Sequence, residues 1–198
     1  MIRLLLFIWL LHANLSACAT CAVMTPMTEV TITLQGKKES IHNIHYRWEF
    51  SEVYSTELRF QFDDNNNGKI DPDELKEMES IKIDYLKPRN MLSTITYRDI
   101  GSNKEHPLNS RFRNFHLEYK DRQFIFSYDG NTLYEPQPES ILSFVFQDSE
   151  GFFDFRVIEL KKENIDFELR ENTYLFTAAV LFENPSALSE TPTKPSEE

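Results

Sequence analysis

The feature that most constrains the fold is a succession of short runs in which apolar and polar residues alternate. About nine such runs, rich in β-branched and aromatic residues, occupy residues 27–35, 40–50, 94–100, 112–119, 123–128, 141–147, 152–160, 165–169 and 173–182. Alternation with a period of two places the apolar side chains of a strand on one face. Short strands at this spacing, without helices between them, favour an antiparallel sandwich over a parallel α/β sheet.

Residues that favour turns separate the runs. Asp129-Gly130-Asn131 and Arg170-Glu171-Asn172 are each predicted to reverse the chain, because Gly, Asn and Asp tolerate the backbone angles that turns require. The 16 Phe and 8 Tyr against only 5 Gly suit a β-rich core. We therefore expect an α+β fold, mainly β, in which an antiparallel β-sandwich-like domain spans residues 28–183 and carries one helix–loop–helix, EF-hand-like insertion at 51–87.

The insertion is the one region with helical periodicity. After its central loop, apolar residues recur at helical spacing, at Leu75, Met78, Ile81 and Tyr85. Lys87-Pro88 is expected to end this second helix, since a residue before proline disfavours helical angles. In the first helix, residues 59–62 alternate instead, so we expect that helix to end early.

The loop between the two helices, Asp63 to Glu74, fits the twelve-residue calcium loop of an EF-hand. The oxygen ligands expected at positions 1, 3, 5, 7, 9 and 12 are Asp63, Asn65, Asn67, the main-chain carbonyl of Lys69, Asp71 and Glu74. Calcium requires six to eight hard oxygens, so the chain must curl tightly, and Gly68 stands at the bend. The spacing predicts a calcium site.

A metal-free interpretation of part of this loop exists. Asp71 as N-cap, Pro72 at N1 and Glu74 at N3 make a good helix start without an ion. That interpretation does not account for the preceding ligand and bend positions. A single loop with three carboxylates and two amides is typical of extracytoplasmic affinities, on the order of 10⁻⁴ to 10⁻³ M, so a structural clip is favoured over a switch.

The N-terminus has the pattern of a secretory signal peptide. A basic start at residues 1–3 is followed by an unbroken apolar run, Leu4 to Leu11, and by small residues up to Ala17. The run is too short to span a bilayer, and no later stretch approaches the length required. We therefore expect residues 1–17 to be removed and the mature protein to be exported to the periplasm.

Both cysteines lie in the predicted linker, residues 18–27, and their fate has three alternatives. Leu15 to Cys18 matches a lipobox, in which Cys18 becomes the lipidated N-terminus and anchors the protein to a membrane. Cleavage after Ala19 discards Cys18. If both thiols are retained, Cys18 and Cys21 form a C-x-x-C pair suited to a disulfide, a transition metal or redox chemistry.

Other features exclude several classes of function. The 21 basic against 32 acidic residues, a net charge of -11, argue against a nucleic-acid partner. The chain has no nucleophile elbow, P-loop, dinucleotide fingerprint or zinc-hydrolase motif, so we do not expect an enzyme. Residues 184–198 are rich in Pro, Ser, Thr and Glu and are expected to form a disordered tail.

Two histidines are spaced H-x-x-H, at His42 and His45. Odd spacing on a strand puts them on opposite faces, so they cannot bind one ion. His42 alternates with Ile44 and Tyr46 and is expected to be a half-buried packing residue.

The order of a signal peptide, an N-terminal strand, an aromatic strand and a single D-x-N-x-N-G-x-I-D-x-x-E loop at 63–74 resembles one bacterial family. This is the uncharacterised family of exported proteins described as periplasmic components of ABC-type transport systems. Trp48, Phe50 and Tyr54 carry the likeness together with the loop. It is best over residues 28–100 and extends through the strands to Phe182.

Genes of that family often lie beside nickel/cobalt or zinc transport genes. The resemblance therefore implies membrane transporter subunits as partners and a role as calcium-binding accessory protein of a metal-ion transport system. Its members begin the mature chain with a His-Pro-His motif, which implies a transition-metal site, where this chain has Cys18-Ala-Thr-Cys21. Either the thiolates replace the imidazoles or that site is gone. The alternative function is a structural or adhesive surface or periplasmic lipoprotein with a structural calcium site.

Overall fold

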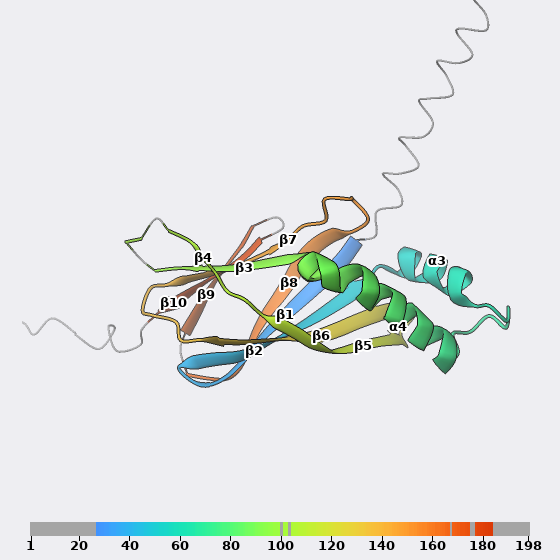
Figure 1. Cartoon of the computed structure of the whole chain (residues 1–198), viewed down its shortest axis with the longest axis horizontal. Coiled ribbons are helices and arrows are strands. Elements are labelled where there is room, and N and C mark those ends of the chain that lie inside the picture. The colour runs from blue at the N-terminus through green and yellow to red at the C-terminus, as the bar shows by residue number, and fades with distance from the viewer. Residues whose placement is uncertain (1–26, 100, 103, 167, 175–176, 184–198) are drawn as a thin grey trace, which may run out of the picture.

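Two five-stranded sheets and a helical pair make up the computed structural model, which describes residues 27–99, 101–102, 104–166, 168–174 and 177–183 (Figure 1). The first sheet has the order β5 (Arg111–Lys120), β6 (Gln123–Tyr134), β2 (Ser40–Phe50), β1 (Met27–Lys38), β8 (Asp154–Ile165). The second has the order β4 (His106–Pro107), β3 (Ser93–Arg98), β7 (Ile141–Phe146), β10 (Thr177–Glu183), β9 (Glu168–Tyr174). The helices are α3 (Glu52–Phe62), α4 (Pro72–Leu86) and the 3₁₀ segment η1 (Lys87–Leu92).

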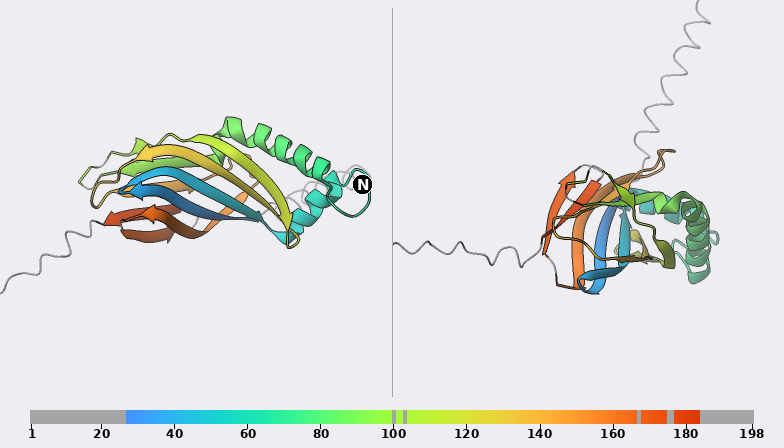
Figure 2. Two further views of the ribbon diagram at one scale, coloured as in Figure 1. Left: turned by 90° about the horizontal axis from the view of Figure 1, so that it is seen from below. Right: turned by 60° about the vertical axis from the view of Figure 1, so that its left-hand side comes forward.

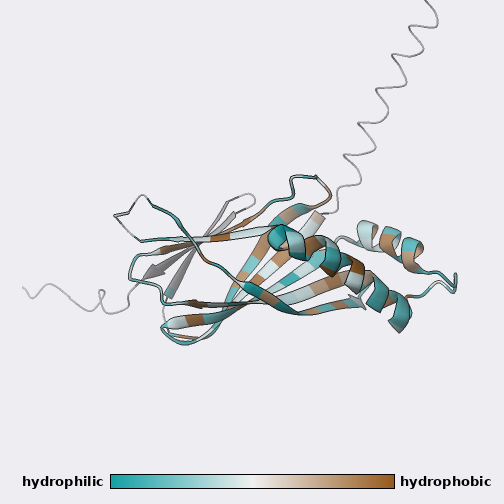
Figure 3. Ribbon diagram, in the orientation of Figure 1, coloured by the Kyte–Doolittle hydropathy of each residue, from teal (hydrophilic) through white to brown (hydrophobic). Residues whose placement is uncertain are grey.

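The predicted class, mainly β with a sandwich-like core and a helix–loop–helix insertion, is confirmed. Figure 2 shows both helices toward one end of the sheets. Coloured by hydropathy, the strands show the alternation on which the prediction depended (Figure 3).

One pair of strands departs from the antiparallel expectation. β1 and β8 pair in parallel, from Met27 opposite Asp154 to Lys38 opposite Ile165, whereas the other strand pairs that the structure describes are antiparallel. The chain crosses from the second sheet to the first between β7 and β8, so β8 enters beside β1 in the same direction. Alternation has the same period in both kinds of ladder and could not distinguish them.

The turn predicted at Asp129-Gly130-Asn131 is wrong, because these residues lie inside the continuous strand β6. A Cβ atom at Gly130 would lie 3.2 Å from Cε2 of Tyr46 and 3.3 Å from Cβ of Ser110. The glycine therefore allows the Tyr46 ring to pack closely on the strand, which is the other common use of glycine within a sheet.

The turn predicted at Arg170-Glu171-Asn172 is also wrong, since these residues lie within β9. The predicted strand 165–169 does not form either: β8 ends at Ile165 and β9 begins at Glu168. β9 is the last strand of its sheet, where charged residues are tolerated and discourage pairing with another chain.

The core lies between the sheets and is built mainly of aromatic side chains. On β2, Tyr46, Trp48 and Phe50 are fully buried, and Trp48 packs against Phe126 from β6 and Phe155 from β8. Aromatic rings bury a large apolar area each, so this cluster supplies much of the hydrophobic stabilisation.

Two polar side chains connect the helices to the first sheet by hydrogen bonds. The buried Ser55 hydroxyl in α3 donates to the carbonyl of Phe50 (3.4 Å) and accepts from the main-chain N–H of Phe124 (3.0 Å). In α4, Oε2 of Glu79 accepts from the N–H of Leu117 at 2.6 Å. These hydrogen bonds hold α3 to β2 and β6, and α4 to β5.

Several predictions concern parts of the chain outside the described residues. These are the signal peptide 1–17, the two thiols of Cys18 and Cys21, and the tail 184–198. Among the helices that are described, neither has the length and apolar character needed to cross a bilayer.

Candidate calcium-binding loop

Helix α3 leads directly into the acidic loop. It begins after Ser51, whose hydroxyl accepts from the N–H of Tyr54 (3.4 Å), and it continues to Phe62. The expected early end is therefore wrong. The alternating residues 59–62 do not interrupt the helix. Phe60 is 73% exposed, while Phe62 packs against the core.

The carboxylate of Asp63, the first expected ligand, binds the main chain at the bend of the loop. Its Oδ1 accepts from the N–H of Asn67 (2.9 Å) and its Oδ2 from the N–H of Gly68 (2.8 Å). Gly68 has a φ of +77°, in the left-handed region that favours glycine. The bend expected at this glycine is thus present.

The two expected amide ligands stabilise successive turns of the backbone. Oδ1 of Asn65 accepts from the N–H of Asn67 (3.0 Å), and Oδ1 of Asn67 accepts from the N–H of Lys69 (2.8 Å). Both side chains also donate through Nδ2 to the same oxygen, Oδ2 of Asp71, at 2.8 Å. Three of the expected ligand side chains therefore converge on one another.

Glu74 closes the loop from the other end. Its Oε1 accepts from the N–H of Asp64 (3.0 Å) and from Nδ2 of Asn65 (3.1 Å), while its Oε2 accepts from the N–H of Asp71 (2.8 Å). The last contact belongs to the capping box that starts α4. Glu74 is 8% exposed. The capping interpretation is thus correct for the start of α4, and the same carboxylate also contacts the opposite end of the loop.

The electrostatics of the loop leave its carboxylates without neutralisation. Between residues 63 and 74 the chain has five acidic residues and one basic residue, Lys69. Among the described residues, no basic side chain pairs with Asp63, Asp71 or Glu74, which accept hydrogen bonds only from neutral N–H groups.

The oxygen ligands that the loop offers fit a hard divalent cation. No three His, Cys, Asp or Glu side chains in the described part of the chain are grouped as metal ligands. An EF-hand loop does not require such a group, because amide oxygens and a main-chain carbonyl complete its ligand set. Here the Nδ2 atom of Asn65 lies between Asp71 and Glu74. Binding would require the amides of Asn65 and Asn67 to rotate and present their oxygens.

A buried lysine on α4 was missed by the sequence analysis. Nζ of Lys82 lies 4.6 Å from the ring centre of Phe50, 5.5 Å from that of Tyr54 and 5.9 Å from that of Phe153. Burial lowers the pKa of Lys82 to about 8. The rings interact favourably with the ammonium group, and no acid among the described residues pairs with it.

The buried face of α4 is also rotated from the one predicted. Its buried residues are Glu74, Met78, Lys82 and Leu86, while Ile81 is 49% exposed. The spacing of four from Glu74 and Met78 was the available signal for Lys82. The apolar stripe predicted for this helix does not include Lys82.

The two histidines have different hydrogen-bond partners, but the argument from strand alternation is wrong here: β2 shifts register between Ile41 and Asn43, and Ile41 and Ile44, which have the same spacing, are both buried. Nδ1 of His45 lies 2.8 Å from Oδ1 of Asp129, whereas Nε2 of His42 lies 2.8 Å from the hydroxyl of Ser40. His42 is exposed rather than half-buried, because the pairing of β2 with β6 shifts register between Ile41 and Asn43.

Asp129 is held in its charged form by its surroundings. Burial alone would raise the pKa of Asp129, but hydrogen bonds from Asn114, His45 and Asn43 lower it overall. Asp129 and these three partners lie on the outer side of three adjacent strands. Their hydrogen bonds join those strands.

Comparison with known proteins adds one assignment. A family model described as a protein of unknown function, DUF1007, matches residues 28–180. A comparison with curated proteins found no match to the chain. The matched range includes the helix–loop–helix and begins at the first strand.

Proposed function

The chain belongs to the DUF1007 family, and on that premise we propose that it is a non-enzymatic, exported calcium-binding accessory protein of a membrane metal-ion transport system. The observation that carries the calcium part is the convergence of Asn65, Asn67, Asp71 and Glu74 by hydrogen bonds from both ends of one loop. Hydrogen bonds within the protein are enough to bring these residues together.

Calcium is the cation that this ligand set fits best. The side chains offer carboxylate and amide oxygens only, without the nitrogen or sulfur ligands that transition metals prefer. Asp63 and Glu74 would hold the ion from the end of α3 and the start of α4. Bound there, the ion would supply two positive charges, which offset two of the three negative charges of these carboxylates and hold the two helices together.

The calcium proposal is tested on the chain without residues 1–17 by terbium luminescence and calcium titration. We expect one site per chain with a dissociation constant on the order of 10⁻⁴ to 10⁻³ M. Asp63→Asn and Glu74→Gln should abolish binding, because each removes a charged ligand. Asp64→Asn is the matched control, since it removes one charge at a position that supplies no ligand. The absence of binding at about 10 mM calcium would contradict the proposal.

The transport role is supported by the resemblance carried by Trp48, Phe50, Tyr54 and the loop at 63–74. Its test is purification from the native envelope after cross-linking, followed by identification of the attached proteins. Subunits of a metal-ion transporter and reduced metal uptake in a deletion strain are the expected results. Uptake that is unchanged, with no transporter subunit attached, would contradict this role.

A second candidate is a structural or adhesive lipoprotein with the same calcium site. It is favoured by Leu15-Ser16-Ala17-Cys18, which matches a lipobox. This candidate predicts a membrane-bound protein with no transporter partner. If Cys18 is instead retained as a free thiol, Cys18 and Cys21 become the candidate transition-metal pair.

A further inference from the structure

Four exposed apolar side chains lie toward the end of the molecule where the described chain begins. They are Met27, Val53, Phe60 and Phe152, which are 48%, 70%, 73% and 57% exposed. Figure 1 shows the start of β1, helix α3 and the loop before β8 toward this same end. We call these four residues the apolar end face. Apolar residues grouped on a protein surface mark a contact with another molecule or with a membrane.

Backbone contacts bring three of these residues together. The N–H of Ser51 donates to the carbonyl of Met27 at 3.1 Å, and Val53 follows two residues later in the first turn of α3. Met27 also pairs with Asp154, which lies two residues after Phe152 in the chain. The starts of β1, β8 and α3 therefore place these three exposed side chains at one edge of the first sheet.

Helix α3 extends the apolar end face away from the sheet. Val53 and Phe60 are seven residues apart, nearly two full turns, so they share one side of the helix. The buried residues of α3, Ser55 and Leu58, lie on the opposite side. The helix thus has one side toward the core and an apolar side toward the surroundings.

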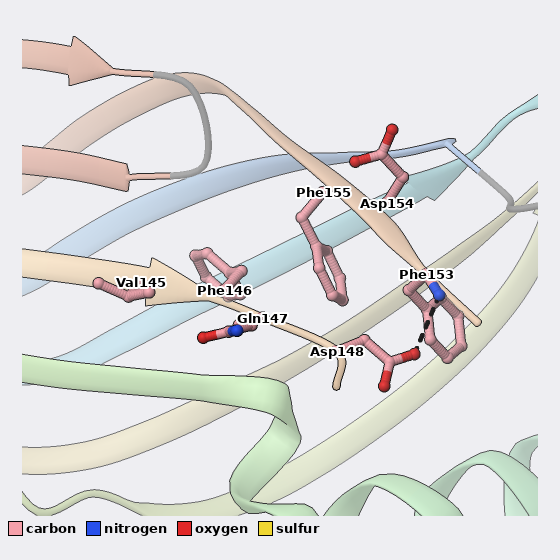
Figure 4. Close-up of a pocket in the computed structure, with 7 residues that line it drawn as sticks. All are labelled: Val145, Phe146, Gln147, Asp148, Phe153, Asp154 and Phe155. Atoms are coloured by element: carbon pink, nitrogen blue, oxygen red, sulfur yellow. Dashed lines mark hydrogen bonds between the residues drawn. The ribbon is translucent and has the colours of Figure 1, made fainter. Parts of the chain in front are cut away.

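The loop before β8 holds Phe152 in an exposed position. The carboxylate of Asp148 accepts from the main-chain N–H groups of Phe152 and Phe153 at 2.7 and 3.0 Å, and Figure 4 draws the contact with Phe153. The ring of Phe153 packs against Trp48, whereas that of Phe152 lies edge-on to Tyr85, with ring centres 6.2 Å apart. An exposed ring on a hydrogen-bonded loop loses little conformational freedom when it binds.

The predicted mature N-terminus lies within reach of this end. Nine residues, 18–26, precede Met27, and nine extended residues span at most about 30 Å. A lipid on Cys18, expected from the lipobox, would therefore hold the apolar end face within that distance of a membrane leaflet. Weak surface contacts become effective when a tether raises the local concentration of their partner.

The charges at this end favour one kind of lipid. The guanidinium carbon of Arg59 lies 5.5 Å from the ring centre of Phe60, so the charged group can contact a lipid phosphate when the ring enters the leaflet. The loop that follows α3 has five acidic residues and one basic residue and would repel an anionic surface. A zwitterionic phospholipid offers the phosphate without a net negative charge.

We propose that the apolar end face docks on a leaflet of zwitterionic phospholipid, with Val53, Phe60 and Phe152 at the level of the headgroups. Helix α3 then lies along the membrane surface. The anchor on Cys18 and the apolar end face supply the two attachments that stable membrane binding requires. The proposal rests on the lipoprotein candidate for its membrane location, and it does not depend on calcium.

The test replaces the lipid anchor by a tether, so its result does not depend on the fate of Cys18. The chain without its predicted signal peptide carries an N-terminal polyhistidine segment and is held on phosphatidylcholine vesicles that contain a nickel-chelating lipid. Brominated phosphatidylcholine quenches tryptophans that enter the leaflet. The reporters are Val53→Trp and Phe60→Trp. Leu133→Trp is the matched control, because Leu133 is 70% exposed and lies at the opposite end of the first sheet.

We expect quenching in Val53→Trp and Phe60→Trp and none in Leu133→Trp beyond the shared background of Trp48, which is fully buried. Phe60→Ser should weaken vesicle binding, measured by release with imidazole, about tenfold, because one aromatic ring no longer enters the lipid. Leu133→Ser should be released like the natural chain. Adding Glu74→Gln to Phe60→Trp should leave the quenching unchanged, which separates this proposal from the calcium proposal.

Several outcomes would overturn the proposal. Equal quenching in Leu133→Trp and Phe60→Trp would show that the tethered protein has no preferred orientation. Quenching that appears only with anionic phosphatidylglycerol would exclude the zwitterionic lipid as the partner. A chain that is not quenched but sediments as a dimer, which Phe60→Ser dissociates, would assign the apolar end face to a second copy. A lipid found on Cys18 together with no quenching on the tethered vesicles would reject the docking face and leave the lipoprotein candidate intact.

Discussion

The ammonium group of Lys82 lies 4.6 Å from the ring centre of Phe50, in the core beneath α4. Burial lowers the pKa of Lys82 from 10.5 to about 8. Between these values the unfolded chain holds a proton that the folded chain has lost, so stability rises with pH from about 8 to 10.5. Above about pH 10 the raised pKa values of Tyr46 and Tyr128 act in the opposite direction, because only the unfolded tyrosines ionise.

We predict that Lys82→Met is more stable than the natural chain at pH 7. A difference of about 2.5 pKa units corresponds to about 3 kcal/mol, and lost contact with the rings reduces the gain to about 1–3 kcal/mol. Denaturant unfolding at pH 7, 8, 9 and 10 measures it. The variant should also lose the rise above pH 8. Lys76→Met, an exposed lysine on the same helix, should leave the profile unchanged. A Lys82→Met protein that is less stable than the natural chain at pH 7 would contradict this account.

Calcium should raise the melting temperature of the natural chain, since the ion binds the folded loop and not the unfolded one. Glu74→Gln should abolish this rise while its calcium-free stability stays close to that of the natural chain, because glutamine can also complete a capping box. Glu74→Ala should lose the rise and about 1 kcal/mol in addition. Thermal unfolding with and without calcium distinguishes the three proteins. A calcium-dependent rise that persists in Glu74→Gln would show that this carboxylate is not a ligand.

Ser55→Ala should destabilise the fold by about 1–3 kcal/mol, because it leaves the buried N–H of Phe124 without its acceptor. Thr56→Ala is the control, since the Thr56 hydroxyl donates to the carbonyl of Glu52 in an exposed position. Its expected effect is within about 0.5 kcal/mol. Hydrogen exchange at Phe124 provides a local readout, and slow exchange at that amide in Ser55→Ala would be the contrary result.

The full-length product should partition into detergent, and Cys18→Ser should release or misprocess it while calcium binding at Asp63 to Glu74 is unchanged. Phase separation followed by mass spectrometry of the N-terminus measures this. A mature protein outside the detergent phase that begins at or before Cys18 with a free or disulfide-bonded thiol would exclude the lipoprotein. Copper, nickel or zinc binding that is lost in Cys21→Ser would then support the C-x-x-C pair.

Local signals in the sequence were sufficient for the helix–loop–helix. The positions of Asp63, Gly68, Asp71 and Glu74 are set by interactions within twelve residues, so their spacing predicts both the bend and the start of α4. Alternation likewise located most strands, because each strand has one face in the core.

Long-range packing determined what the sequence did not reveal. Gly130 suggests a turn by composition, yet the approach of the Tyr46 ring from the neighbouring strand explains it. Lys82 suggests a solvent-facing position, yet aromatic rings from β2 and from the segment before β8 enclose it. Both cases depend on residues far away in the chain, which no local window contains.

The parallel pairing of β1 with β8 has a consequence for how the protein is made. Gln35 and Glu163 are hydrogen-bonded at 2.9 Å although 128 residues separate them. A chain that emerges from its N-terminus cannot complete the first sheet until β8 has appeared, and contacts of such high sequence separation slow folding. A product truncated before β8 would leave one side of β1 unpaired and prone to aggregate, so nascent chains of this protein depend on the late arrival of a single strand.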